Sequence, residues 1–186
     1  MMRDNTIDVV VTNGYRVIDN KETLRWKDFA KARLDPLATL LSENWLTSSS
    51  ALFRSTSITV DYFDDDLKYR EWLVLAFRLC LARRNIYFLD TLTNRIYENK
   101  ESLSRTPSYF LAEPITLKYM LSFDVPVAIR RILKRKLSAS LHNVSAYYLQ
   151  NGEIWQAWKS HLKSLCYPGG LRYLLYTRKL VAIVFN

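Results

Sequence analysis

Residues 72–81 read WLVLAFRLCL and decide how the rest of the chain packs. Apart from Arg78, this segment is apolar nearly all round, which predicts a helix buried on most of its sides. The aspartates at positions 64–66 suit the positive N-terminal end of a helix. We therefore expect a helix from Leu67 to about Arg84, which forms the buried spine of the fold.

Three segments around this helix predict β-hairpins. In TIDVVVTNGYRVID, residues 6–19, Asn13-Gly14 separates two β-branched runs and tolerates the positive φ of a type I′ turn. IYFLDTLTNRIYEN predicts a central hairpin of strands 86–91 and 95–99, and LRYLLYTRKLVAIVF, at 171–185, predicts a third. A further strand is expected in STSITVDYF, residues 55–63. The fold class is therefore α+β, with a helical core and N-terminal, central and C-terminal hairpins.

Helical patterns fill most of the remaining sequence. They cover 21–34, a helix that begins at Asp35-Pro36 and reaches Leu46, and then 114–122, 126–139 and 153–166. The chain has 186 residues, 49% of them apolar, with four glycines, five prolines and no low-complexity linker. This length and composition predict a single domain, 1–186.

The positive charge of the chain is confined to one part of the sequence. Lys and Arg number 27 against 18 Asp and Glu, a net charge of +9. Residues 125–186 hold ten basic residues and one acid, whereas 1–124 hold 17 of each sign. Such an excess attracts polyanions. We expect a neutral part, 1–124, and a basic, nucleic-acid-facing part, 125–186; the alternative is a charge that only keeps the protein dissolved.

The charge is densest in a predicted amphipathic helix from Asp124 to about Ala139. An apolar seam recurs at three- and four-residue spacing: Val125, Ile129, Ile132, Leu133 and Leu137. Four cations share the opposite face, namely Arg130, Arg131, Lys134 and Arg135, whereas Lys136 falls on the seam side. This pattern favours phosphate contacts through one helix face, and its alternative is a core helix with a solvated basic face.

The second half of residues 115–135, read as two helices with a tight turn, loosely resembles the recognition helix of helix-turn-helix DNA-binding proteins. The residues concerned are Ile129, Arg130, Arg131, Ile132 and Leu133, although Ser122 and Phe123 replace the glycine usual in the turn. The other basic candidates for nucleic-acid contacts are Lys159, Lys163, Arg172, Arg178 and Lys179. Aromatic rings of this region are expected mostly inside, with one or two exposed tyrosines that stack on bases.

Several protein classes find little support in the sequence. The longest apolar stretches are far shorter than the roughly 18 residues of a membrane span, and no signal-peptide pattern opens the sequence. The two cysteines, Cys80 and Cys166, predict no disulfide framework. These features predict an intracellular, reducing compartment and no integral membrane segment. An anionic membrane surface, bound by a matrix-like protein, remains an alternative partner.

Catalytic patterns are sparse. With only His142 and His161, most acid–base and metal schemes lack residues, and no cofactor or metal is expected. One constellation suggests a Mg²⁺-dependent nuclease: Asp90 at a strand end, with Glu98 and Lys100 on the next strand. The preferred hypothesis is a non-enzymatic nucleic-acid-binding protein, RNA or DNA, with protein partners in a larger nucleoprotein assembly.

Overall fold

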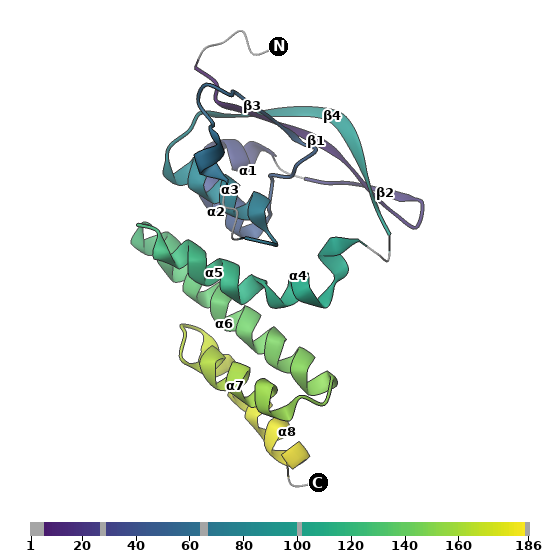
Figure 1. The fold of residues 1–186 in the computed structure, drawn as a ribbon, viewed down its shortest axis with the longest axis vertical. Coiled ribbons are helices and arrows are strands. Elements are labelled where there is room, and N and C mark those ends of the chain that lie inside the picture. The colour runs from purple at the N-terminus through teal and green to yellow at the C-terminus, as the bar shows by residue number, and fades with distance from the viewer. Residues whose placement is uncertain (1–5, 27–28, 64–66, 100–101, 185–186) are drawn as a thin grey trace. The chain divides into compact units, whose positions relative to one another are not determined.

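The computed structural model describes residues 6–26, 29–63, 67–99 and 102–184, and the chain is mixed α+β, as expected (Figure 1). The chain divides into two compact units, Met1–Thr106 and Pro107–Asn186. The single domain expected over 1–186 stays a prediction. The first unit combines a sheet with short helices, and the second is helical.

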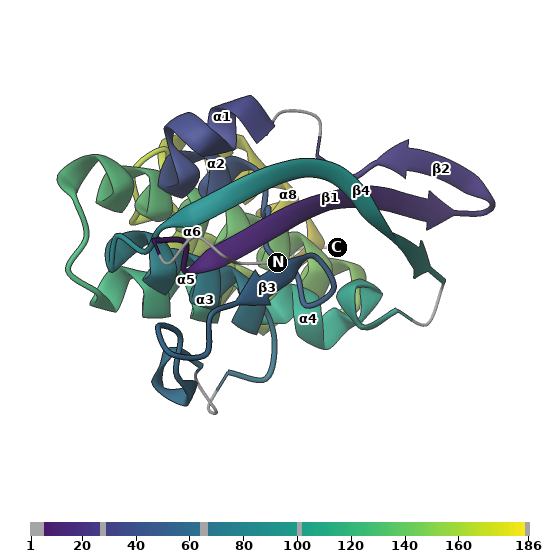
Figure 2. The same ribbon diagram turned by 90° about the horizontal axis from the view of Figure 1, so that it is seen from above.

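A mixed sheet organises the first unit. Its strands are β1 (Val9–Ile18), β2 (Lys21–Leu24), β3 (Ala51–Phe53) and β4 (Ile86–Glu98). Along one edge, β1 pairs antiparallel with β2 and β3, and along the other edge it pairs parallel with β4. Figure 2 shows β1 and β4 running side by side. The first strand is therefore the centre of the sheet.

The N-terminal hairpin turns six residues later than predicted. Its turn is Asp19-Asn20, where φ is 49° and 62°, and Asn13-Gly14 lies inside β1. Asn13 is only 1% exposed, and its Nδ2 donates to the Trp26 carbonyl and to Asp90 Oδ1, both at 3.0 Å. Gly14 is needed for close approach, because an added Cβ would collide with Asn94.

The predicted central hairpin is wrong, because β4 is one continuous strand of 13 residues. Its polar segment, which looks like a turn in the sequence, is a bulge. Thr12 pairs with Leu89, Asn13 with Leu92 and Gly14 with Asn94, so β4 accommodates extra residues there. Beyond the bulge, β4 continues to pair with β1 in the parallel direction, and the local sequence pattern does not predict this pairing.

Three helices cover one face of the sheet: α1 (Phe29–Leu34), α2 (Pro36–Ser42) and α3 (Glu71–Leu81). The predicted start of α2 is confirmed, since Asp35 Oδ1 accepts a hydrogen bond from the Ala38 amide at 2.9 Å, although this helix ends before Leu46. The helix predicted over 21–34 is wrong in its first part, which forms β2. The strand predicted over 55–63 is also wrong, because this stretch holds turns and a 3₁₀ helix at Val60–Tyr62.

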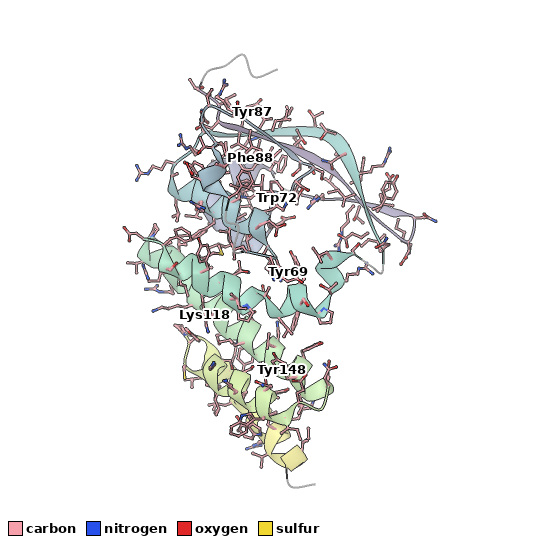
Figure 3. The ribbon with its side chains drawn as sticks, viewed as in Figure 1. Tyr69, Trp72, Tyr87, Phe88, Lys118 and Tyr148 are labelled. Atoms are coloured by element: carbon pink, nitrogen blue, oxygen red, sulfur yellow. The ribbon has the colours of Figure 1, made fainter. Side chains whose placement is uncertain are left out.

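The predicted buried spine is present as α3, but it covers Glu71–Leu81 rather than the expected 67–84, and the aspartates 64–66 expected at its start lie outside the described residues. Its buried side chains are Val74, Leu75, Ala76, Phe77 and Leu79. Phe88 of β4 points toward the helices at 1% exposure and packs edge-on against Trp45, whereas Tyr87 points to the opposite face and is 49% exposed (Figure 3). That opposite face holds a cavity of about 420 Å³ whose lining side chains are uncharged.

The second unit consists of α4 (Pro107–Leu111), α5 (Glu113–Ser122), α6 (Val127–Gln150), α7 (Ile154–Leu165), a 3₁₀ helix (Gly170–Tyr173) and α8 (Leu174–Val184). The three predicted helices are present, and the unassigned stretch after 139 continues α6. Two buried serines join α6 to α7: Ser138 Oγ donates to the Ser164 carbonyl at 2.9 Å, and Ser145 Oγ to the Ala157 carbonyl at 2.7 Å. These pairs run in opposite directions along the two helices, which are therefore antiparallel.

The predicted C-terminal hairpin is wrong, because residues 174–184 form helix α8. Tyr173, Tyr176 and Leu180 recur at helical spacing, and this side packs on the other helices: Tyr173 stacks on His142 with ring centroids 3.9 Å apart, and Leu180 is fully buried. β-Branched residues favour a strand, but a strand here has no described sheet to join within this unit. Tertiary contacts with α6 and α7 therefore override local propensity.

Candidate nucleic-acid interface

The basic helix predicted at 124–139 is the first half of α6, which begins at Val127 after Pro126 as its N-cap. The apolar seam is confirmed: Val125, Ile129, Leu133 and Leu137 are buried, and Ile132 is half-buried. Packing of this seam fixes the rotation of the helix about its axis. The seam therefore determines where the cations of the other side lie.

Four cations of α6 form the feature that we call the α6 basic cluster: Arg130, Arg131, Lys134 and Arg135. Arg131, Lys134 and Arg135 are exposed, and Arg130 is half-buried. Within the described residues, none of the four forms an ion pair with a carboxylate. Acids are scarce around them, since residues 107–186 carry three Asp and Glu against eleven Lys and Arg, a net charge of +8.

Arg172 lies in the 3₁₀ helix that follows the loop after α7, and Gly169 of this loop lies near Arg135 of the α6 basic cluster. A Cβ added at Gly169 would lie 3.9 Å from Cγ of Arg135, so the Arg135 stem passes this loop. The Arg172 guanidinium donates to the Tyr173 hydroxyl and lies 4.7 Å from the centre of its ring. Because Tyr173 stacks on His142 of α6, Arg172 is tied to the α6 surface.

The other four candidates lie on other helices. Lys159 and Lys163 lie on α7, and Arg178 and Lys179 lie on α8, all with exposed side chains. Lys179 Nζ is 5.9 Å from the centre of the Tyr176 ring. The nine predicted contact residues are thus four on the first half of α6, one in the 3₁₀ helix that follows α7, and four on α7 and α8.

The aromatic rings of the helical unit are half-buried rather than inside as expected, and the exposed ring is a tryptophan rather than a tyrosine. Trp155 is 80% exposed, whereas Trp158, Tyr147 and Tyr173 are half-buried. Exposed leucines of α7 and α8 accompany Trp155, and those at 174 and 175 could not be placed on a helix face while 171–185 was expected to form strands. Their spacing of three and four residues is the signal that identifies the exposed face of a helix.

Two histidines lie inside the helical unit. His161 is fully buried and its Nε2 is 2.8 Å from Thr177 Oγ1, while the ring of His142 lies 6.4 Å from that of His161. Burial lowers the pKa of both imidazoles. No cluster of three or more metal-ligating His, Cys, Asp or Glu occurs among the residues that the structure describes.

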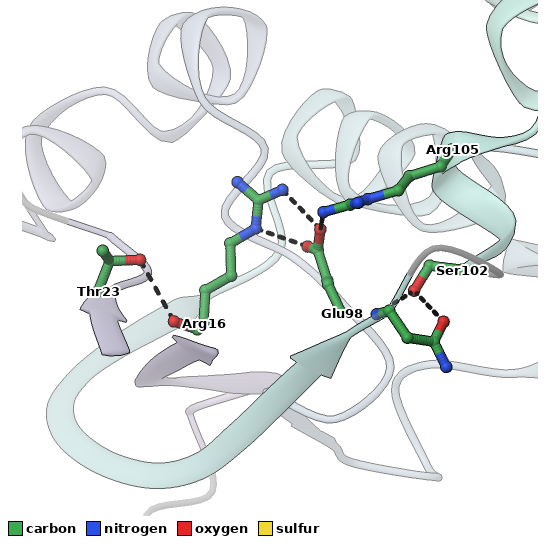
Figure 4. A network of polar contacts seen from close by, with 6 residues as sticks. Arg16, Thr23, Glu98, Ser102 and Arg105 are labelled. Atoms are coloured by element: carbon green, nitrogen blue, oxygen red, sulfur yellow. Dashed lines mark hydrogen bonds and ion pairs between the residues drawn. The ribbon is translucent and has the colours of Figure 1, made fainter. Parts of the chain in front are cut away.

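The nuclease constellation is not assembled as predicted. Asp90 and Glu98 lie on the same strand, eight residues apart in the sequence, rather than on neighbouring strands. Both Glu98 oxygens accept hydrogen bonds from Arg16 at 2.6 Å, and Arg105 lies 3.9 Å away (Figure 4). Arg16 lowers the Glu98 pKa, so this carboxylate is a structural ion-pair partner. Lys100 lies outside the described residues.

Among the helices that the structure describes, none combines the length and the apolar character needed to cross a membrane. Comparisons of the chain with protein families, with curated proteins and with solved structures find no match.

Proposed function

We propose that the protein is an intracellular, non-enzymatic nucleic-acid-binding protein that contacts phosphates through the α6 basic cluster and Arg172. The observation that carries the proposal is the cluster itself: four cations within six residues of one helix, without a carboxylate partner among the described residues. When these cations bind a phosphate, no existing ion pair has to be broken first. Their electrostatic free energy is fully available for binding.

The geometry of the cluster suits a phosphate backbone. Residues 130–135 span about 7.5 Å of helix axis at about 1.5 Å per residue, so neighbouring side chains reach successive phosphates of one strand. The first turn of α6 contains no acid, and its free amide groups add positive potential at the same end of the helix. Both effects attract an anion without reading base sequence.

The charge distribution also supports a division of labour within a nucleoprotein assembly. Residues 1–106 carry 16 Lys and Arg against 15 Asp and Glu, and several of them pair with each other, as Arg16 does with Glu98 and Arg95 with Glu22. Such an internally paired surface has little attraction for phosphate. We propose that this part contacts protein partners.

Salt-dependent binding tests the proposal. Neutralising three or four phosphates of duplex DNA gives a slope of log K against log[salt] of about −2.7 to −3.6, which is roughly a 40- to 150-fold loss between 50 and 200 mM salt. Fluorescence anisotropy with a labelled duplex DNA and a single-stranded RNA, using the full chain, measures this slope. Failure to bind either polymer at 50 mM salt refutes the proposal.

A pair of charge-matched variants locates the site. Arg131→Glu combined with Lys134→Glu and Arg135→Glu is expected to abolish binding and flatten the slope. The control, Lys159→Glu with Lys163→Glu and Lys179→Glu, changes the net charge equally on α7 and α8 and is expected to retain the slope. Equal losses in both variants would show that net charge, rather than the α6 basic cluster, drives binding.

A further inference from the structure

The solvent sides of α7 and α8 carry apolar side chains where a solvated helix normally carries polar ones. On α7, Trp155 is 80% and Leu162 is 52% exposed; on α8, Leu174 is 50% and Leu175 is 73% exposed. Isolated exposed apolar residues are common, but several on two adjacent helices mark an interaction surface. The exposure of these side chains is therefore a functional signal.

Three of these side chains, those of Trp155, Leu162 and Leu174, share one side of the helical unit, whereas Leu175 lies about 100° from Leu174 around α8. The contact of His161 with Thr177 marks the line where α7 meets α8. At about 100° per residue, Leu162 lies about 100° from His161 around α7. It is on the side away from Ala157 and Ser164, whose carbonyls accept the hydrogen bonds from α6. Leu174 lies about 60° from Thr177 around α8, in the matching direction for antiparallel helices. A plane that touches both helices therefore meets these leucines together.

We define the α7–α8 face as the residues that such a plane meets: Trp155, Lys159, Leu162, Leu174, Arg178 and Val181. The two cations lie between the apolar side chains rather than in a separate patch. No Asp or Glu occurs anywhere from Ile154 to Val184, a stretch that contains five Lys and Arg. The face is thus apolar and cationic, and the nearest acid in the sequence is Glu153, the N-cap of α7.

This combination decides between occupants. Phosphates of a nucleic acid pair with Lys159 and Arg178 but leave Trp155 and the leucines exposed to water. A second copy of the chain would place cations against cations with no acid in this stretch to compensate. A surface of anionic lipids matches both properties, because headgroups take the cations while Trp and Leu enter the boundary between headgroups and acyl chains.

We propose that the α7–α8 face docks on an anionic membrane surface, with the helices lying along the lipid interface. This docking is independent of the α6 basic cluster and does not rest on nucleic-acid binding. Each cation near an anionic surface contributes roughly a fivefold gain in binding, so Lys159 and Arg178 predict about a 30-fold preference for anionic over neutral vesicles. The apolar side chains supply the part of binding that salt does not screen.

Vesicle sedimentation with the full chain tests the proposal. Vesicles of phosphatidylcholine with 30% phosphatidylserine are expected to bind the protein, and pure phosphatidylcholine vesicles to bind it at least tenfold more weakly. Brominated lipid is expected to quench tryptophan fluorescence, and the quenching is expected to fall in the Trp155→Ser variant. Equal binding to both vesicle types, or no binding to either, overturns the proposal.

Matched variants separate the face from general apolar exposure. Trp155→Ser with Leu162→Ser is expected to lose vesicle binding at least tenfold while the salt slope for DNA is unchanged. The control, Ile115→Ser with Val127→Ser, removes two apolar side chains of 66% and 75% exposure from α5 and α6 and is expected to bind vesicles normally. If the first variant still binds vesicles, or if its only effect is to abolish self-association seen by light scattering, the occupant is not a membrane.

Discussion

Substituting Asn13→Asp tests whether this residue is a buried bridge in β1 or an exposed turn residue. Asp-Gly suits a type I′ turn as well as Asn-Gly does, so an exposed turn would tolerate the change. Inside β1, the substitution replaces the Nδ2 donor, which serves the Trp26 carbonyl and Asp90 at 3.0 Å each, by a carboxylate oxygen. Two hydrogen bonds are lost, and two carboxylates face each other.

The expected cost follows from these contacts. The buried Trp26 carbonyl, left without its donor, costs about 1–3 kcal/mol, and the part-buried bond to the exposed Asp90 adds less, before any charge repulsion. For a unit of this size, each kcal/mol lowers Tm by roughly 4–8 °C, which predicts a fall of at least about 4 °C. The exposed fraction of Asn13, only 1%, leaves little room for water to replace the missing donors.

Urea unfolding of the full chain, followed by tryptophan fluorescence, measures the loss. The control is Asn20→Asp, the same chemical change at the real turn, where φ is 62°. Asp tolerates this conformation nearly as well as Asn, so the control is expected to cost less than about 0.5 kcal/mol. A cost below about 1 kcal/mol for Asn13→Asp, or similar costs for the two variants, would refute the assignment of Asn13 to the strand.

Three further predictions concern buried groups. Burial lowers the pKa of His142 and His161 from 6.5, so on acidification the unfolded chain binds protons before the folded chain does. The free energy of unfolding is therefore highest above about pH 7 and falls below pH 6.5, by at most about 1.4 kcal/mol per pH unit per histidine. A Tm that is equal at pH 7.5 and pH 5.5 would contradict this. Gly170→Ala is expected to destabilise the helical unit by at least about 2 kcal/mol in thermal unfolding, since the added Cβ meets backbone atoms of α7, and an unchanged Tm would argue against this close approach. Burial raises the pKa of Cys80 to about 12, so this thiol is protonated and unreactive at pH 8, whereas Cys166 is exposed. Mass spectrometry after iodoacetamide treatment of the native protein at pH 8 is expected to show alkylation of Cys166 alone. Rapid labelling of Cys80 would exclude its burial.

Much of the fold could be predicted where local pattern and tertiary environment agree. The buried α3, the start of α2 at Asp35 and the apolar seam of α6 all follow from periodicity and capping, because their side chains pack in the way that the sequence pattern implies. The α6 basic cluster could be predicted for the same reason. Once the seam faces inward, the cations on the other side must face solvent.

The failures share a cause in contacts between distant segments. Asn13-Gly14 looks like a turn, yet its amide is used by Trp26 and Asp90, which lie 13 and 77 residues away. The polar bulge of β4 mimics a loop because its ladder partner is far away in the sequence. In α8, β-branched residues favour a strand, and only packing against α6 and α7 makes the segment helical. The α7–α8 face could not be predicted before that helix was assigned.

The parallel pairing of β1 with β4 also bears on how the protein is synthesised. Val9 pairs with Ile86, so one side of the central strand waits for 77 more residues before β4 exists, although β2 and β3 can pair with the other side earlier. At about 5–20 residues per second, a ribosome needs roughly 4–15 s to supply them. During this interval β1, with valines on both faces, is available to trigger factors, heat-shock chaperones or another nascent chain. The helical unit contains mainly short-range contacts and has no comparable delay. One side of the first strand is therefore the part of the sheet that waits longest for its partner during synthesis.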